Sequence, residues 1–373
     1  MWGQMKKHNI YFDNAATTPP FSAPETSFVF GNASSPHSLG ITAERFLNSA
    51  RKEMAKIFSC RENEIIFTSG GTESNNLALL GFALANKRQN IRIFSAPWEH
   101  PSVLEPIRFA NELGFAEAII LSDFNKIISH EVCLVSLSQV SHETGDIFNV
   151  SEIAATLKKK NPKIIIHVDG VQGFCKESLD FANIDMYSFS GHKIHGASGV
   201  GGLFVRNGIR LLPILHGGGQ ENGIRAGTEN ICGILQTVSA AAQLHVFRDE
   251  NYLRVSAIKS EIAELKHLLP DVFENSLTKE TSPYILSLSF IGIKGETLVH
   301  LLSEKGIYVS MGAACRSRKK QKSLLETMGF SKERAESAVR FSFSHLNTVE
   351  EASIVKEIII DCVSQMRRVL GRR

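Results

Sequence analysis

A lysine in an unusual setting is the first residue that points to chemistry. Lys193 lies in Ser190-Gly-His-Lys193, between a largely apolar stretch at 185–190 and a glycine-rich stretch at 196–202. One interpretation is a surface lysine in a turn, which is the commoner situation for any single lysine. The other is an amine kept for a Schiff base with a carbonyl group. The rest of the chain has to decide between them.

A carboxylate stands one connection earlier in the chain. Asp169 ends the apolar run 165–169, and the carboxyl ends of parallel strands are where ligands bind in open α/β sheets. Pyridoxal phosphate (PLP) is the cofactor that needs both a Schiff-base lysine and an acidic partner for its ring nitrogen, since the protonated ring withdraws electrons. The alternative, an aspartate that caps the next helix, would be favoured if Asp169 stood alone.

Two further polar segments follow strand-like runs. Ser69-Gly-Gly-Thr72 separates the run 65–68 from a helical pattern, an arrangement that directs backbone N–H groups at a phosphate. His100 follows the run 91–95 and offers a flat imidazole at the same edge. Alone, the glycines indicate only a turn, and the histidine a surface or structural residue. Four such signals at the ends of four strands together favour one site.

The elements that must position these residues are short apolar runs with the length of strands. They lie at 65–68, 91–95, 118–121, 132–137, 164–168, 186–189 and 202–205. Helical patterns separate several of them, one after Gly71 and one from Ser151 to Asn161. Unbroken apolar strands joined by helices are typical of a mostly parallel sheet covered on both faces. We therefore expect an α/β fold whose large domain holds a mostly parallel seven-stranded sheet.

The pattern changes after about residue 250. A charged helical stretch at 251–266 leads to a strand at 284–290, and the later elements are a helix at 296–304, a strand at 307–310, a helix at 322–328 and a strand at 338–343. The closing helix places Ile354, Ile358, Cys362 and Met366 on one stripe. We expect residues 16–250 to form a large PLP-binding domain, and residues 1–15 and 251–373 a smaller α/β domain that carries Cys315.

Composition narrows the class of protein. The chain has 373 residues, 43% hydrophobic and 21% charged, which is ordinary for a globular protein, and its net charge of +3 is too small to indicate nucleic acid or an anionic membrane as a partner. Its first residues are polar, and no apolar run reaches the ~20 residues of a membrane span, so a cytoplasmic location is expected. Six cysteines without a CxxC pair indicate neither a disulfide framework nor a metal site.

Eight motifs carry a family resemblance. They are Asp13-Asn-Ala-Ala-Thr-Thr18, Ser69-Gly-Gly-Thr-Glu-Ser74, Glu99-His-Pro101, His167-Val-Asp-Gly-Val-Gln172, Ser190-Gly-His-Lys193, His216-Gly-Gly-Gly-Gln-Glu221, Arg225-Ala-Gly-Thr-Glu-Asn230 and Val339-Arg-Phe-Ser342. In this order, across almost the whole chain, they resemble the cysteine desulfurase branch of the class V aminotransferase family. The resemblance implies the aspartate aminotransferase-like fold of PLP-dependent transferases, fold type I, with PLP as cofactor.

The resemblance also implies a role for each matching residue. Lys193 holds PLP, and Asp169 pairs with its ring nitrogen. The other implied cofactor contacts are Gln172 to the phenolic oxygen, His100 stacked on the ring, and Gly71, Thr72, Ser190 and His192 around the phosphate. Arg340 matches the substrate-carboxylate arginine, and Asn14 is a further substrate contact. A threonine matching Thr228 reaches the phosphate of the neighbouring subunit, so a homodimer with shared active sites is implied.

Cys315 decides which reaction is expected. It lies in Met311-Gly-Ala-Ala-Cys315, which resembles the thiol loop of desulfurases, and the following cations should favour its thiolate. The expected reaction converts L-cysteine to L-alanine: Lys193 removes the α proton, His100 shuttles protons, and Cys315 attacks the substrate sulfur and becomes a persulfide. Without that thiol, the alternative is another class V PLP enzyme, a selenocysteine lyase or an aminotransferase or lyase on a small amino acid.

Several segments depart from the family pattern and indicate a divergent member. His142 stands where relatives usually carry an asparagine near the phenolic oxygen and the substrate carboxylate. Phe343-Ser-His-Leu-Asn347 replaces the usual Leu-Gly-Arg-Phe-Thr, and the connection between residues 121 and 132 is short. The cations Arg316, Arg318, Lys319, Lys320 and Lys322 form either a solvated loop or a docking site for an acidic sulfur acceptor, such as an iron-sulfur scaffold or a sulfur carrier.

Overall fold

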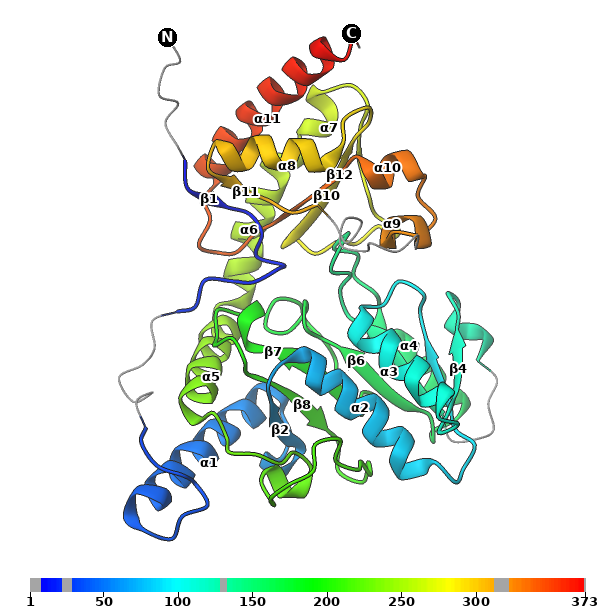
Figure 1. Ribbon diagram of the computed structural model, residues 1–373, viewed down its shortest axis with the longest axis vertical. Helices are drawn as coiled ribbons and strands as arrows, with labels where there is room; N and C mark the ends of the chain where they lie inside the picture. Colours follow the sequence, from blue (N-terminus) through cyan, green and yellow to red (C-terminus); the bar gives the residue numbers. More distant parts are fainter. Residues whose placement is uncertain (1–7, 22–28, 128–132, 312–321, 372–373) are drawn as a thin grey trace. The chain divides into compact units, whose positions relative to one another are not determined.

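The chain divides into two compact units. The computed structural model describes residues 8–21, 29–127, 133–311 and 322–371 (Figure 1). We call residues 19–139 and 148–247 the central unit, and residues 1–18, 140–147 and 248–373 the terminal unit.

A seven-stranded sheet forms the middle of the central unit. Its strands are β2 (Ile65–Thr68), β3 (Arg92–Ser95), β4 (Glu117–Ile120), β5 (Cys133–Ser138), β6 (Ile165–Asp169), β7 (Met186–Ser190) and β8 (Gly201–Val205), in the order β2-β8-β7-β6-β5-β3-β4. All neighbouring pairs are parallel except those of β8, which runs antiparallel to both β2 and β7. Each strand falls on one of the seven apolar runs, so the predicted mostly parallel sheet is confirmed.

Helices cover both faces of this sheet. They are α1 (Ser38–Phe58), α2 (Gly71–Asn86), α3 (Pro101–Glu112), α4 (Val150–Lys160) and α5 (Ile231–Val246). Ile65 and Phe67 face a core shared with α1, α4 and α5, whereas Ile66 faces a second core shared with α2 and α3 (Figure 1). Because successive strand residues point to opposite faces and both faces are buried, the strands are apolar throughout.

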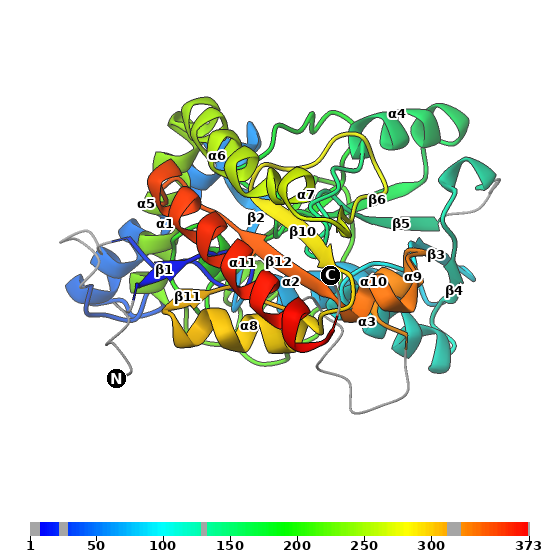
Figure 2. The same cartoon turned by 90° about the horizontal axis from the view of Figure 1, so that it is seen from above.

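The terminal unit has its own core. An antiparallel sheet joins β9 (Val272–Glu274), β10 (Ile285–Phe290) and β12 (Ala338–Ser342), and β1 (Ile10–Tyr11) pairs in parallel with β11 (Ile307–Tyr308). Its helices are α6 (Arg248–Ala263), α7 (Leu265–Leu268), α8 (Gly295–Glu304), α9 (Leu324–Thr327), α10 (Lys332–Glu336) and α11 (Val349–Val369). Figure 2 shows α11 lying over β10 and β12, whose apolar residues share its core.

The buried stripe of α11 differs from the predicted one. The helix buries Ala352, Val355, Ile359, Cys362 and Val363, whereas Ile354 is 39% exposed. The stripe Ile354, Ile358, Cys362 and Met366 is therefore wrong in its first member, because β-branched residues at neighbouring positions allow two phases of the helical period.

The segment 140–147 belongs to the terminal unit because its backbone is tied to the loop before β10. Gly145 O accepts from Ser282 N at 2.8 Å, and Ile147 N donates to Glu280 O at 3.0 Å. The buried carboxylate of Asp146 accepts from the hydroxyl of Ser276 at 2.6 Å and from the backbone N–H of Thr278 at 2.9 Å. These contacts hold His142 next to the elements that carry Arg340.

Most candidate cofactor residues lie on the central unit, where strands end. β6 ends at Asp169, β7 ends at Ser190, and a short 3-10 helix, η4 (Gly191–Lys193), follows β7 directly. The glycine turn joins β2 to α2, and His100 precedes α3. None of the helices in the described part of the chain is both long and apolar enough to cross a bilayer.

Candidate active site

The glycine turn before α2 has the form of a phosphate cradle. Gly70 has φ 154°, which favours glycine, and a Cβ at Gly71 would lie 2.5 Å from Val171 Cγ2. A Cβ at Gly70 would lie 3.7 Å from Ser190 Oγ, so the Ser190 hydroxyl stands beside the turn. The first N–H groups of α2 have no acceptor within the helix, and the positive end of the helix dipole lies at this turn, which also carries the exposed Thr72.

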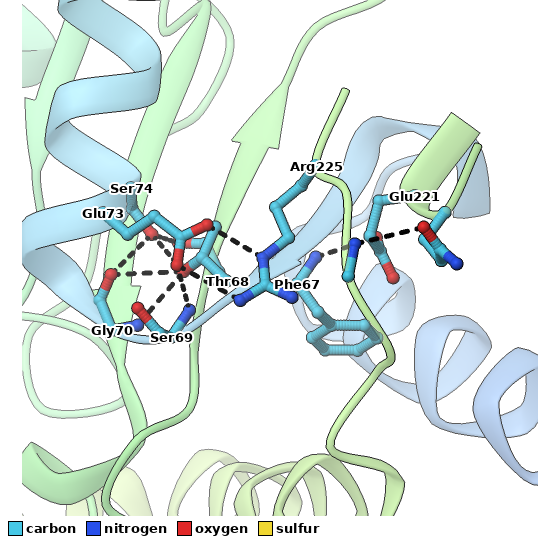
Figure 3. A network of polar contacts seen from close by, with 11 residues as sticks. Phe67, Thr68, Ser69, Gly70, Glu73, Ser74, Glu221 and Arg225 are labelled. Carbon is cyan, nitrogen blue, oxygen red and sulfur yellow. Dashed lines mark hydrogen bonds and ion pairs between the residues drawn. The ribbon is translucent and has the colours of Figure 1, made fainter. Parts of the chain in front are cut away.

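A partly buried ion pair fixes this turn (Figure 3). The Glu73 carboxylate accepts from Ser69 N at 2.8 Å and from Arg225 Nε at 2.9 Å. Burial raises the pKa of Glu73, but the hydrogen bonds from Arg225 and Ser69 outweigh that effect and hold the pKa below its usual value. The negative charge therefore stays in place at neutral pH and locks the turn to the segment 221–230.

The same segment is anchored a second time. Glu221 is buried and accepts from Phe67 N at 2.9 Å and from Arg51 Nη2 at 2.7 Å. Glu221 itself adopts φ 47°, a conformation that its fixed carboxylate contacts maintain. Thr228 follows on this anchored segment with an exposed side chain. Exposure is what a reach toward a neighbouring subunit requires.

Asp169 is a buried acceptor with neutral donors. Its Oδ2 accepts from Asn75 Nδ2 at 2.8 Å and its Oδ1 from Val171 N at 3.1 Å, and the residue is 7% exposed. Both of these donors within the described residues are neutral, and a buried carboxylate with neutral donors still favours a positively charged donor nearby. A protonated ring nitrogen supplies such a donor.

Lys193 and Asp169 act on the same imidazole. Burial is the largest effect on His100 and lowers its pKa. The Asp169 carboxylate raises the pKa and the Lys193 ammonium lowers it, so the net pKa lies below the usual value for histidine. Lys193 also affects His192. Burial is the largest effect, followed by the charges of Lys193 and Lys176, and together they lower the pKa of His192 to about 4. His192 is therefore neutral at physiological pH and offers a hydrogen bond rather than a charge. Lys193 is half-buried and does not project as a surface lysine.

Glu99 is a neutral acid beside this group. It is 2% exposed, its Oε1 accepts from Ser138 N at 2.9 Å, and its Oε2 contacts the Ser138 hydroxyl. Burial raises its pKa to about 8, more than the Ser138 hydrogen bonds lower it. Both contacts are made by carboxyl oxygens that accept, Oε1 from the N–H and Oε2 from the hydroxyl of Ser138, and a protonated carboxyl keeps lone pairs for both.

We expect Glu99→Gln to change the pH dependence of stability. The folded-state pKa of about 8 lies above the ordinary 4.5, so the folded chain keeps a proton that the unfolded chain loses, and stability falls as the pH rises through this window. Glutamine does not titrate: its oxygen still accepts from Ser138 N, and its NH₂ donates to the Ser138 hydroxyl after that hydroxyl turns. As the pH rises from about 6 to about 8, the free energy of unfolding of the variant should therefore increase by roughly 1–2 kcal/mol relative to that of the wild type, measured by urea unfolding.

Glu73→Gln is the matched control for that measurement. The pKa of Glu73 is lowered by Arg225 and Ser69 against the effect of burial, so its contribution to stability is present above the unfolded pKa and is lost in acid. Its glutamine variant should lose stability relative to the wild type at neutral pH. A Glu99→Gln difference that stays constant with pH would contradict the assignment of a neutral Glu99.

In the terminal unit, Arg340 is held from two sides. Its Nη1 donates to the His142 carbonyl at 2.8 Å and its Nη2 to Asp13 Oδ1 at 3.1 Å, while the residue is 7% exposed. Its buried Nε has no hydrogen-bond acceptor among the described residues. A buried guanidinium N–H without an acceptor fits a carboxylate ligand.

Asn14 has a structural role as well. Its Nδ2 donates to Ser342 O at 3.0 Å and to Asn347 Oδ1 at 3.3 Å, and Asn347 in turn donates to Glu351 of α11. Asn14 Oδ1 is buried and has no donor among the described residues. The amide nitrogen of Asn14 thus makes hydrogen bonds that stabilise the fold, and the amide oxygen is the atom that suits the predicted contact with the substrate.

Gln172 is buried three residues after Asp169, and Thr72 and His100 line one groove of about 590 Å³ between α2 and α3. Cys315, Arg316, Arg318, Lys319 and Lys320 lie outside the described residues. The roles of all these residues stay predictions. Two residues that the sequence analysis did not single out, Asn75 and Ser102, contact Asp169 and His100, respectively.

Comparison with known proteins gives the family. The family model for aminotransferase class-V matches residues 10–355. The chain belongs to the aminotransferase class-V family. Within it, a NifS/IcsS protein homolog of Lactobacillus delbrueckii subsp. bulgaricus is 39% identical over 363 residues, 92% of this chain and 94% of that protein. Cysteine desulfurase IscS of Dictyoglomus turgidum is 32% identical over 97% of this chain and 96% of its own.

A solved structure agrees with these relatives. A NifS-like protein, 32% identical in sequence, superposes with a TM-score of 0.87 over 96% of this chain and all of its own. The resemblance to the cysteine desulfurase branch is therefore confirmed, and with it the fold of type I and the dependence on PLP. The residues at the sheet edge fit that cofactor: a buried carboxylate with neutral donors for the ring nitrogen, an amine at 193, and a helix N-terminus with Ser190 for the phosphate.

Proposed function

We propose that this cysteine desulfurase converts L-cysteine to L-alanine and takes the sulfur onto Cys315. The observation that carries the proposal is the hydrogen-bonded link from Asp169 through Asn75 and Ser102 to His100, with Lys193 directly after the neighbouring strand β7. It supports an amine, a carboxylate and an imidazole at one edge of the sheet. When bound there, PLP withdraws electrons from the substrate α carbon. The residues of the chain supply the remaining steps.

Arg340 and Lys193 act on the substrate first. The buried Arg340 recognises the substrate carboxylate through its guanidinium, with Asp13 and the His142 carbonyl fixing the plane of the group. The Lys193 amine accepts the α proton at Nζ. His142, in place of an asparagine, contributes its backbone oxygen to this arrangement, and its predicted contact with the cofactor remains part of the proposal.

Cys315 takes the sulfur. Its thiolate attacks the substrate sulfur, an S–S bond forms as the Cβ–S bond of the substrate breaks, and the electron pair stays with the substrate carbon, which is protonated to give alanine. The persulfide sulfur then passes to an acceptor, an iron-sulfur scaffold or a sulfur carrier, and the cations after Cys315 suit an acidic one. The proposal includes a homodimer in which Thr228 of one subunit contacts the PLP phosphate bound by the other subunit. It also includes a cytoplasmic location.

The test is product analysis with cysteine variants. The wild type should release alanine from L-cysteine and carry one additional sulfur on the peptide with Cys315, detected by mass spectrometry. Cys315→Ala should form no persulfide, and its rate of sulfide release should be at least tenfold lower than that of the wild type, because only cofactor-assisted elimination is left. Cys60→Ala is the matched control: burial, and then Glu64, raise the pKa of Cys60 to about 12, so its thiol is protonated and unreactive.

Two results would contradict the proposal. Desulfuration by Cys315→Ala at the wild-type rate would remove the persulfide step. Turnover of selenocysteine without turnover of cysteine would favour the selenocysteine lyase alternative, and transamination of a small amino acid the aminotransferase alternative.

A further inference from the structure

A chain of hydrogen bonds links His100 to Asp169 through two residues without an assigned role. His100 is the N-cap of α3, and its Nδ1 accepts from Ser102 N at 3.1 Å. The Ser102 hydroxyl lies 2.7 Å from the same Nδ1. Asn75 Nδ2 lies 2.9 Å from Ser102 Oγ and 2.8 Å from Asp169 Oδ2. The four residues come from α2, α3 and the end of β6.

The direction of each bond follows from chemistry. An ionised carboxylate only accepts, so the Asn75 amide must turn its nitrogen toward Asp169, and the second hydrogen of that nitrogen points to Ser102 Oγ. Ser102 Oγ thus receives a hydrogen, which leaves its own proton to donate to His100 Nδ1. Asn75 is fully buried and Ser102 is 8% exposed, so water offers little competition for these bonds.

Nδ1 of His100 therefore faces two donors. The backbone N–H of Ser102 cannot reverse, because the turn of α3 fixes it, and a proton on Nδ1 would collide with it. The positive end of the α3 dipole also disfavours an imidazolium at this place. We propose that Ser102 and Asn75 are positioning residues that hold His100 as a neutral imidazole with its proton on Nε2.

This arrangement determines which group donates a proton and which accepts one. With Nδ1 occupied as an acceptor, His100 meets its surroundings as an Nε2–H donor and not as a base, and the α proton falls to the Lys193 amine. Among the described residues, Asp169 at the end of β6 and Lys193 in η4 act on the charge of the ring in opposite directions. The assignment to a reaction step rests on the proposed function, whereas the tautomer does not.

The tautomer can be read directly by NMR. In full-length, PLP-loaded protein with ¹⁵N-labelled histidine, long-range ¹H–¹⁵N correlations distinguish a protonated Nε2 from a protonated Nδ1, and the spectrum of His100→Gln assigns the signals. We expect the wild type to show the Nε2–H form from about pH 6 to pH 9. Ser102→Ala should raise the pKa of His100 by about half to one unit, because a hydrogen bond to the neutral form is lost.

Ser102→Thr is the matched variant, since it keeps a hydroxyl at the same distance, and its His100 should titrate like the wild type. The acidic limb of kcat/KM should move with the NMR pKa in Ser102→Ala while KM stays within about twofold. An Nδ1–H form in the wild type, or Ser102→Ala titrating like the wild type, would overturn the proposal. Because the spectrum needs no turnover, a wild type with the expected tautomer but no action on cysteine would count against the proposed function alone.

Discussion

Lys193→Ala should abolish desulfuration, lowering the rate by at least ~10⁴-fold, because a general base worth about 10²–10⁴ is lost together with the covalent attachment of the cofactor. The structure places this amine at the end of η4, where its charge acts on both His100 and His192. Borohydride reduction followed by peptide mass spectrometry should find reduced PLP on Lys193 in the wild type. The variant should carry none.

Lys176 makes this a demanding test. Burial lowers its pKa to about 8, more than the nearby Glu177 raises it, and its charge also reaches His192. A buried lysine with a lowered pKa has a larger fraction of free amine, which is the form that reacts with a carbonyl. Lys176 is thus the best competing attachment site in the described central unit. Reduced PLP on Lys176 in the wild type would refute the role of Lys193.

The sheet was predictable because burial on both faces leaves a simple mark in the sequence. Each strand is a short unbroken apolar run, so all seven could be located from the residues alone. The antiparallel direction of β8 follows from the short connection that joins it to β7. Between Ser190 and Gly201 this connection contains one helical element, the 3-10 helix η4, whereas a crossover between parallel strands needs a longer connection, usually with an α-helix.

Helix phase was less predictable. In α11, neighbouring β-branched residues such as Ile354 and Val355 are equally apolar, but only Val355 is buried. The period of the helix gives a stripe, and the packing of β10 and β12 against it selects which of two adjacent stripes is used. Sequence alone cannot make that selection, because it depends on the position of another element.

The candidate site divides in the same way. Asp169, Lys193 and His100 could be singled out because strand ends mark the ligand edge of an α/β sheet. Asn75 could not, since nothing in the spacing from Gly71 to Asn75 shows that its amide faces a carboxylate 94 positions away. Hydrogen bonds between residues on different elements depend on tertiary geometry. For Cys315 the family motif remains the source of the prediction.

Asp169→Asn should retain PLP on Lys193 but lower kcat for L-cysteine by about 10²–10³-fold, the usual loss when a fixed charge at the reacting group is removed. The amide cannot balance a positive ring nitrogen. Its NH₂ also meets a donor whichever way it turns, Val171 N on one side or Asn75 Nδ2 on the other. Reversal of the Asn75 amide relieves the second conflict, but it removes the hydrogen that Asn75 donates to Ser102 Oγ.

Asp185→Asn is the matched control for this prediction. Asp185 is 5% exposed and accepts from Ile166 N at 2.8 Å near the opposite end of β6, where it pairs with Lys158 at 2.7 Å. Its amide variant loses a buried charge of the same kind and should be less stable, with kcat close to the wild type. Asp169→Asn with kcat within about threefold of the wild type at full PLP occupancy would show that this carboxylate does not act on the cofactor ring, since removal of a fixed charge there cannot cost so little.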